Sequence, residues 1–421
     1  MGQPKLSYIA ETLIGSEIVK LGNMIKERVK QGEKIYNYTI GDFDPKVFPI
    51  PSVLEQYIKD AYTNGYTNYP SAEGEAYLRE AVSGFVKKYA KMDYAANEIQ
   101  IAAGGRPLMY ALFQVIVDKG DKVIYAVPSW NNNHYAHLTG AESCIITSKL
   151  ENNFMPTAAE IAPHISGATL LCLCSPQNPT GTTISKKELT EICDMVVAEN
   201  AKRGADEKKL YVMFDQMYWT LTYGDTEHYS PVSLNPAMKE FTIYIDGISK
   251  SFCATGVRVG WSLGPATVIA KMKAILSHLG AWAPMAEQKA TGDFLNNEAA
   301  VETFFTSYKG KLWSLLQQLY AGFSALKADG FDVDVVAPKA AIYMTIKFDL
   351  AGKKTADGTV LSTQEDVTQY LLANAGLAIV PFYCFGAEKT SPWYRLSIGT
   401  CKEEDIKEMF EKLKNALNNL A

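Results

Sequence analysis

The chain has 421 residues, which is enough for two to three domains and a large hydrophobic core. Hydrophobic residues make up 47% of it and charged residues 21%, a balance typical of soluble globular proteins. A net charge of -5 with scattered Lys and Arg excludes the basic surface of a nucleic-acid-binding protein, and no segment has the apolar length that crosses a membrane.

Seven irregularly spaced cysteines and a start without an apolar signal region predict free thiols and a cytoplasmic location. Cys172 and Cys174 lie in an apolar run and are expected to be buried strand residues. A metal site is disfavoured because no second Cys or His pair has ligand spacing.

The first hundred residues are predicted to be mainly helical. Residues 6–32 form one helix whose apolar face contains Ile14, Ile18, Leu21, Met24 and Ile25. A short strand at 36–40 ends in a glycine turn, and helices at 52–64 and 74–89 flank an aromatic loop at 65–70.

From residue 99 short apolar runs alternate with helices. Strands are expected at 99–103, 122–127, 144–147, 169–174, 210–214, 241–246 and 257–263, and helices at 108–117, after 128–130, at 157–164 and at 186–203. This alternation predicts an α/β fold with a mostly parallel, doubly wound sheet, whose ligands bind at the carboxyl ends of the strands.

After residue 264 the pattern becomes helical, and 299–329 is one long amphipathic stretch that connects two domains. Strands at 342–348, 378–380 and 394–398 and a closing helix from 403 predict a small α+β domain.

Several polar residues follow the predicted strands and could form one site. Each alone has a simpler interpretation as a turn, a helix cap, a core ring or a surface charge. Together they offer a phosphate-binding turn, a flat ring, an amide, an acid next to a phenol, a lysine and an arginine, in Gly104-Gly105-Arg106, Trp130, Asn178, Asp215 with Tyr218, Lys250 and Arg258. This combination is what pyridoxal phosphate requires.

Over nearly its whole length the chain resembles class I/II aminotransferases of fold type I, in particular the branch with bacterial aspartate aminotransferases. The motifs that carry the resemblance are Gly41-Asp42-Phe43-Asp44, Tyr69-Pro70, Gly104-Gly105, Pro128-Ser129-Trp130, Asn178-Pro179-Thr180-Gly181, Asp215-Gln216-Met217-Tyr218, Ser249-Lys250, Thr255-Gly256-Val257-Arg258 and Arg395-Leu396-Ser397. The resemblance implies a seven-stranded sheet, a large cofactor-binding domain at 45–310 and a small domain at 1–44 plus 311–421.

The resemblance also implies a role for each site residue. Lys250 would form the Schiff base with pyridoxal phosphate and then move the proton, and Asp215 would keep the pyridine nitrogen protonated. Asn178 and Tyr218 would bind the phenolic oxygen, and Trp130 would cover the ring. The phosphate would be held by Gly105, Arg106, Ser249 and Arg258, with Tyr69 from the other subunit of a homodimer.

The substrate side of the site follows in the same way. Arg395 would hold the α-carboxylate in a bidentate pair beside Gly41, with Trp130 and Asn178 also in contact with the substrate. Two departures from the family pattern are Gly247, where many relatives have serine, and Arg106, which adds charge to the phosphate site or reaches the far end of the substrate. His134 and His137, one helical turn apart, are given no role.

Three functions remain open from the sequence. The first is transamination between an L-amino acid, with aspartate as the best guess, and 2-oxoglutarate. The second is a carbon–sulfur β-lyase, or a transaminase for alanine, aromatic amino acids or methionine, on the same fold. The third, a non-catalytic cofactor-binding module, is disfavoured because Lys250, Asp215 and Arg395 are all present.

Overall fold

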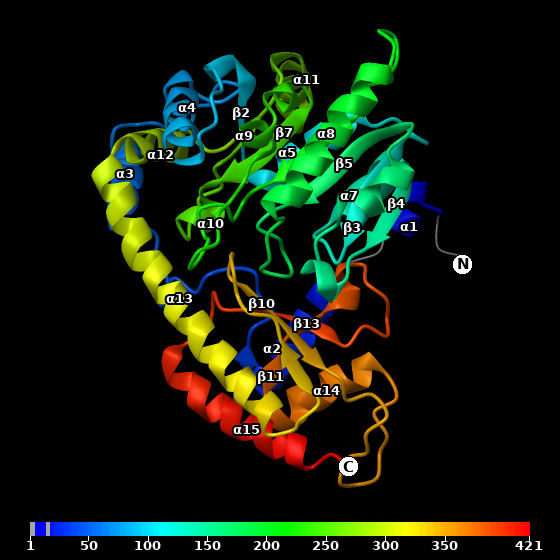
Figure 1. Ribbon diagram of the computed structural model, residues 1–421. Coiled ribbons are helices and arrows are strands. Elements are labelled where there is room, and N and C mark those ends of the chain that lie inside the picture. The colour runs from blue at the N-terminus through cyan, green and yellow to red at the C-terminus, as the bar shows by residue number, and fades with distance from the viewer. Residues whose placement is uncertain (1–4, 14–16) are drawn as a thin grey trace.

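The computed structural model describes residues 5–13 and 17–421, and its main layer is a seven-stranded sheet (Figure 1). The strand order is β2-β8-β7-β6-β5-β3-β4; β8 pairs antiparallel with β2 and β7, and the other neighbouring pairs are parallel. The strands are β2 (Ile99–Ala102), β3 (Lys122–Val127), β4 (Glu142–Thr147), β5 (Ala168–Cys174), β6 (Tyr211–Asp215), β7 (Thr242–Gly247) and β8 (Gly260–Leu263). The predicted mostly parallel sheet is confirmed.

Helices cover both faces of this sheet, because its central strands bury side chains on both sides. Val123 and Tyr125 of β3 pack with Leu112 on one face, while Ile124 packs with Val196 on the other. The helices of the first face are α5 (Gly105–Ile116), α6 (Asn132–Thr139) and α11 (Ala266–Leu279). Those of the second are α3 (Ser52–Thr63), α4 (Ala76–Ala90), α7 (Ala158–Ile161), α8 (Lys186–Lys202) and α12 (Met285–Asn296).

The long helix α13 (Glu298–Ala328) runs from the large sheet to a smaller sheet (Figure 1). Val301, near its start, belongs to the core of the large sheet, and Leu312 and Phe323, further along, belong to the second core. The predicted connector at 299–329 is therefore confirmed to within one residue.

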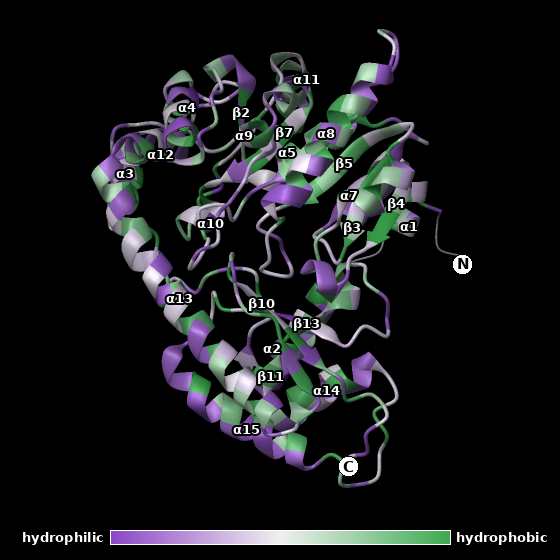
Figure 2. Ribbon diagram, viewed as in Figure 1, coloured by the Kyte–Doolittle hydropathy of each residue, from purple (hydrophilic) through white to green (hydrophobic). Residues whose placement is uncertain are grey.

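The smaller sheet is antiparallel, with strand order β12-β13-β10-β9. Its strands are β9 (Val333–Val335), β10 (Tyr343–Phe348), β12 (Val380–Pro381) and β13 (Trp393–Ser397), and β1 (Tyr36–Asn37) pairs in parallel with β11 (Leu377–Ala378) beside it. Helices α14 (Gln364–Ala375) and α15 (Ile406–Asn418) pack into the same core. Figure 2 shows hydrophobic and hydrophilic residues alternating along α15, whose buried face includes Met409 and Leu413.

Several predicted boundaries are wrong for identifiable physical reasons. The N-terminal segment forms two helices, α1 (Tyr8–Thr12) and α2 (Glu17–Lys30), instead of one. Leu21 and Ile25 are buried, whereas the predicted apolar residue Ile14 lies outside the described residues. Helix α5 begins at Gly105, three residues early, because Pro107 fits the first turn of a helix. Strand β8 begins only at Gly260, since Arg258 has a φ of +62°.

The remaining elements are short. They are the helices α9 (Pro231–Leu234) and α10 (Ile248–Ser251) and the 3-10 helices Ala96–Glu98, Leu150–Asn152, Ala162–His164, Pro236–Glu240, Phe382–Phe385 and Glu403–Asp405. None of the seven cysteines forms a disulfide within the described residues. Within residues 5–13 and 17–421, no helix combines the length and the hydrophobicity needed to cross a bilayer.

Candidate active site

A cavity of about 580 Å³ lies between the carboxyl ends of the large sheet and strands β10 and β13 of the smaller one. Figure 1 shows these two strands below the edge that carries α10. The sequence-predicted residues that line it are Gly41, Gly105, Arg106, Trp130, Asn178, Asp215, Tyr218, Ser249, Lys250, Arg258 and Arg395. The topology therefore brings together every predicted site residue except Tyr69.

Lys250 lies in the single turn α10, directly after the end of β7. Its Nζ donates a hydrogen bond to the carbonyl oxygen of Gly41 and lies 5.6 Å from the centre of the Phe43 ring. Burial lowers the pKa of this amine from 10.5 to about 8, although the nearby Asp42 opposes the shift. At pH 7 about a tenth of the Lys250 side chains therefore carry a neutral, nucleophilic amine, far more than for a lysine with an ordinary pKa.

The lowered pKa of Lys250 predicts a stability that depends on pH. Below pH 8 the folded protein must bury a charged amine, so Lys250→Met should raise the free energy of unfolding of the cofactor-free protein at pH 7 by about 1–3 kcal/mol, after the lost hydrogen bond is subtracted. Between pH 8 and 10.5 the unfolded chain binds more protons than the folded one, so wild-type stability rises and the difference should disappear. Denaturant unfolding from pH 7 to 10.5 measures this, with the exposed Lys271→Met as control. Equal stability of wild type and Lys250→Met at pH 7 would contradict it.

Asp215 is the last residue of β6, and its carboxylate is 8% exposed. Burial raises its pKa to about 6, although its Oδ1 accepts a hydrogen bond from the Met217 backbone N–H at 3.0 Å and the neighbouring Cys174 thiol also opposes the shift. Among the described residues it has no ion-pair partner, so a carboxylate at the cavity wall is suited to a cationic N–H group of a ligand. Cys174 was predicted only as a buried strand residue, and its position beside Asp215 follows from the pairing of β5 with β6.

Arg395 in β13 is only 1% exposed, yet it has no carboxylate partner among the described residues. Its Nη1 donates to Asn178 Oδ1 at 3.0 Å and its Nη2 to the Thr39 carbonyl at 2.5 Å, while its buried Nε has no partner. The guanidinium lies 4.8 Å from the ring centres of both Tyr343 and Phe385. A buried, oriented and unpaired guanidinium is a binding site for a carboxylate.

Tyr218 has a partner that the sequence analysis missed. Its hydroxyl lies 2.5 Å from the hydroxyl of Tyr343, at the start of β10. Tyr343 lay in a predicted strand and was given no role in the site; only the packing of the small sheet against the large one places it in the cavity. It also restricts Gly41, because a Cβ there would lie 2.7 Å from the Tyr343 hydroxyl.

The N-terminus of α5 and Arg258 form an anion-binding corner. Arg258 donates from Nη1 to the Thr255 carbonyl at 2.6 Å and from Nη2 to the Ala103 carbonyl at 2.7 Å. Gly104 has a φ of +90°, and any side chain there would collide with the Arg258 guanidinium. The corner joins backbone N–H groups at a helix start to a fixed cation, and Ser249 lines the same cavity.

Arg106 and Trp130 lie together at the rim of the cavity. The Arg106 guanidinium carbon is 5.3 Å from the centre of the Trp130 ring, and Arg106 is exposed whereas Trp130 is partly buried. Trp130 also contacts Phe385, with ring centres 6.2 Å apart. Lys26 of α2 lines the cavity as well, although its helix was predicted without a site residue.

Two other predicted features lie outside the cavity. Tyr69 is 83% exposed and its ring lies 5.4 Å from that of Trp282, so its predicted contact across a dimer interface stays a prediction. His134 and His137 do not form a metal site, since no group of three or more possible ligands exists in the described part of the chain. His137 Nε2 lies 2.9 Å from Thr12 Oγ1 of α1.

The structure explains why glycine occupies position 247. A Cβ at Gly247 would lie 2.8 Å from both Gly260 Cα and the Val259 carbonyl oxygen, because β7 and β8 approach closely there. We expect Gly247→Ser to lower the free energy of unfolding by about 1–3 kcal/mol. Gly256→Ser is the matched control, since a Cβ there has nothing within 4 Å. Denaturant unfolding of both variants measures the difference; equal midpoints would show that the strands separate at little cost.

The fold and the site define an enzyme that combines a partly desolvated lysine with a buried carboxylate, an anion-binding helix start and a carboxylate-binding arginine. A sequence model described as aminotransferase class I and II matches residues 34–413, and the chain belongs to this family. It is therefore a transaminase.

Similar proteins agree with this assignment. The chain is 29% identical to an aspartate aminotransferase of Bacillus sp. (strain YM-2), over 91% of this chain and 93% of the relative. It is 28% identical to a probable aspartate/prephenate aminotransferase of Rickettsia felis, over 94% and 92%. Among solved structures, aspartate aminotransferase from Thermus thermophilus with maleate superposes with a TM-score of 0.86 at 25% identity, over 99% of this chain and 100% of that one. The Rhizobium meliloti enzyme reaches a TM-score of 0.90 over both full chains, at 24% identity, and supports the fold.

Proposed function

We propose that the protein is a pyridoxal-phosphate-dependent transaminase that exchanges the amino group between L-aspartate and 2-oxoglutarate. The observation that carries the proposal is the buried, unpaired Arg395 in the same cavity as the partly desolvated amine of Lys250. Arg395 can bind the α-carboxylate of an amino acid, and the amine of Lys250 then lies near the α-carbon next to that carboxylate.

The residues of the cavity fit pyridoxal phosphate. The buried Asp215 carboxylate suits the protonated ring nitrogen, and the corner formed by Gly105 and Arg258 suits the phosphate. Lys250 is placed to bind the aldehyde covalently. Asn178 and Tyr218 are the donors for the phenolic oxygen, and Trp130 offers a flat surface to the ring.

The mechanism follows from what these side chains hold and move. When bound, pyridoxal phosphate supplies an electron sink for negative charge on the α-carbon of an attached amino acid. Once its amine is free, Lys250 would take the proton from the α-carbon and complete a 1,3-proton shift. Asp215 keeps the ring nitrogen charged, and Arg395 fixes the α-carboxylate so that the proton faces Lys250.

Aspartate is favoured because the cavity offers cations for two carboxylates. Arg395 lies deep in it, whereas the exposed Arg106 is held over Trp130 at the rim. Two relatives are called aspartate aminotransferase or probable aspartate/prephenate aminotransferase, which supports the same choice.

If Arg106 binds the side-chain carboxylate, Arg106→Ala should lower kcat/KM for aspartate by about tenfold while changing that for alanine less than about twofold. Steady-state kinetics with both donors and 2-oxoglutarate measures the difference. Cofactor affinity, followed by the absorbance of the bound cofactor, serves as the control. If only cofactor affinity changed and the preference for dicarboxylates survived, Arg106 would belong to the phosphate site alone.

A donor panel tests the proposed reaction. The purified protein loaded with pyridoxal phosphate is mixed with aspartate, alanine, phenylalanine and methionine, and with cystathionine and cysteine as lyase substrates, each with and without 2-oxoglutarate. We expect glutamate to form only with the acceptor present, and fastest from aspartate. Pyruvate and ammonia produced from cystathionine or cysteine without an acceptor would favour the carbon–sulfur β-lyase. Faster turnover of another donor would reassign the substrate.

Three further expectations belong to this proposal. The chain divides into a large cofactor-binding domain at 45–310 and a small domain at 1–44 plus 311–421, which is supported by the separate hydrophobic cores on the two sheets. Two copies form a homodimer in which the exposed Tyr69 reaches the phosphate of the neighbouring subunit. The lack of disulfides among the described residues supports a cytoplasmic location.

A further inference from the structure

A second cavity, of about 880 Å³, lies on the other side of the chain segment that follows β6. Tyr218 lines the active site, whereas its neighbours Trp219 and Thr220 line the second cavity. The other walls come from the C-terminal end of α4, the first turns of α8, the loop up to Leu234 and the first half of α13. A volume of this size accommodates a small metabolite.

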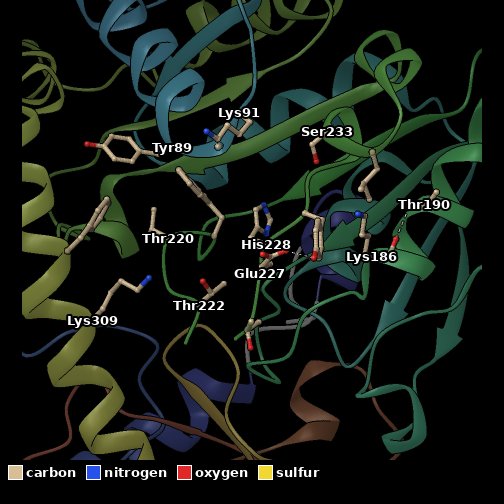
Figure 3. A pocket seen from close by; sticks show the side chains of 16 residues that line it. Tyr89, Lys91, Lys186, Thr190, Thr220, Thr222, Glu227, His228, Ser233 and Lys309 are labelled. Atoms are coloured by element: carbon tan, nitrogen blue, oxygen red, sulfur yellow. Dashed lines mark hydrogen bonds between the residues drawn. The ribbon is translucent and has the colours of Figure 1, made fainter. Parts of the chain in front are cut away.

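The charged side chains of this cavity are mainly lysines without partners. Lys91, Lys186 and Lys309 stand around the central His228 in Figure 3, and none of the three ammonium groups has an ion pair or hydrogen bond within the described residues. Burial lowers the pKa of Lys309, as expected for a cation that faces the cavity without a counter-ion. The one acid among the lining residues, Glu227, accepts a hydrogen bond from Tyr229. The cavity therefore has an excess of positive charge.

Flat rings and an imidazole complete the walls. Tyr89, Trp219, Tyr229 and Phe305 all line the cavity, and Lys186 lies 5.8 Å from the centre of the Tyr229 ring. Both ring nitrogens of His228 are buried and have no partner in the described structure. Burial lowers the pKa of His228 to about 3, so the ring is neutral and the positive charge of the cavity comes from its lysines.

Lysines recognise phosphate and carboxylate groups as point charges, and aromatic walls hold planar rings. We propose that this second cavity is a binding site for a small anion that carries a flat ring, separate from the active site. Its occupant would contact Trp219, whose indole N–H donates to the buried Asp246 Oδ2 at 2.8 Å, four residues before Lys250. It would also contact Thr220, whose hydroxyl donates to Ser251 Oγ at 3.0 Å.

The test measures binding of adenosine 5′-monophosphate, which joins a flat ring to a phosphate, with adenosine and inorganic phosphate as separate arms. Isothermal titration uses the protein already loaded with pyridoxal phosphate, so that the phosphate corner of the active site is filled. We expect saturable binding of the monophosphate with a Kd of about 1 mM or below, and weaker binding of either half alone. Lys186→Met and Lys309→Met should each weaken it by about threefold to tenfold, because each removes one unpaired cation.

Lys187→Met is the matched control, since Lys187 is the next residue of α8 and pairs with Glu191 outside the cavity. All three lysines are exposed or partly exposed, so the variants should fold, which thermal unfolding checks. No saturable binding, equal affinity in all variants, or an equal loss in Lys187→Met would overturn the proposal. Phosphate or adenosine binding as tightly as the monophosphate would overturn its claim for a ring-bearing anion.

Discussion

Replacing Lys250 by Ala should lower the transamination rate by about 10³-fold or more. The substitution removes both the amine that binds the cofactor covalently and the base that moves the α-proton, and each of these steps is worth orders of magnitude. The neutral amine is available because burial lowers its pKa to about 8. Glutamate formation from 2-oxoglutarate, followed over hours at saturating aspartate, measures the residual rate.

The control separates loss of chemistry from loss of the fold. Lys271→Ala changes an exposed lysine of α11 and should leave the rate unchanged. Borohydride treatment followed by peptide mass analysis should attach the cofactor to the peptide that contains Lys250 in the wild type, and to no peptide in Lys250→Ala. A rate in Lys250→Ala within about tenfold of wild type would remove the lysine from the mechanism.

The sequence predicted the residues that follow strands better than those that reach the site from elsewhere. Asp215 stands directly after one apolar run and Lys250 four residues after the next, and parallel strands bring their carboxyl ends to one edge. Alternation along the chain therefore sufficed to place them together. Tyr69 shows the opposite case. It is expected to contact the site of the neighbouring subunit, and the pattern of a single chain does not show how two subunits are arranged.

Tyr343 and Lys26 were missed because their contribution depends on how separate parts of the chain pack. Tyr343 lies in a strand whose apolar neighbours are core, and it meets Tyr218 only through docking of the small sheet. Lys26 belongs to a helix that carries no site motif. Cys174 was predicted to be buried, but periodicity alone does not show that its neighbour in β6 is Asp215.

Local backbone conformation explains the wrong element boundaries. The pattern of 257–263 alternates like a strand, yet Arg258 has a positive φ so that its guanidinium can turn back to the carbonyls of Ala103 and Thr255. The functional contact thus overrides the local preference for extended structure, as is common at binding sites. The helix α14 was not predicted; its buried face is wide and includes Val367, Leu371 and Leu372, and only a narrow stripe that includes Glu365 and Ala373 is exposed, which weakens the helical period that the prediction used.

Arg395→Ala should raise the KM for aspartate by on the order of 10²- to 10³-fold, with a smaller decrease in kcat. A guanidinium has five N–H donors, and the contacts to Asn178 and Thr39 use two of them, so a fork remains for the α-carboxylate. Removing one partner of a buried charged pair costs about 2–5 kcal/mol. The carboxylate is present in the substrate and in the transition state alike, so the loss should fall mainly on KM.

Arg395→Lys separates the contribution of the positive charge from that of the two parallel hydrogen bonds that a guanidinium can donate. It keeps a cation in the cavity but cannot make two parallel hydrogen bonds, so its KM should lie between those of wild type and Arg395→Ala. Succinate, which binds without reacting, should show the same order of inhibition constants, while the cofactor should stay bound because Arg395 donates to Asn178 and Thr39 and not to the phosphate corner formed by Gly105 and Arg258. If Arg395→Ala bound succinate as tightly as wild type, the α-carboxylate would have to be held by another cation of the cavity, and Arg106 or Lys26 would be the next residues to replace. The buried guanidinium would then be a structural group, retained by its contacts with Asn178, Thr39 and the two rings.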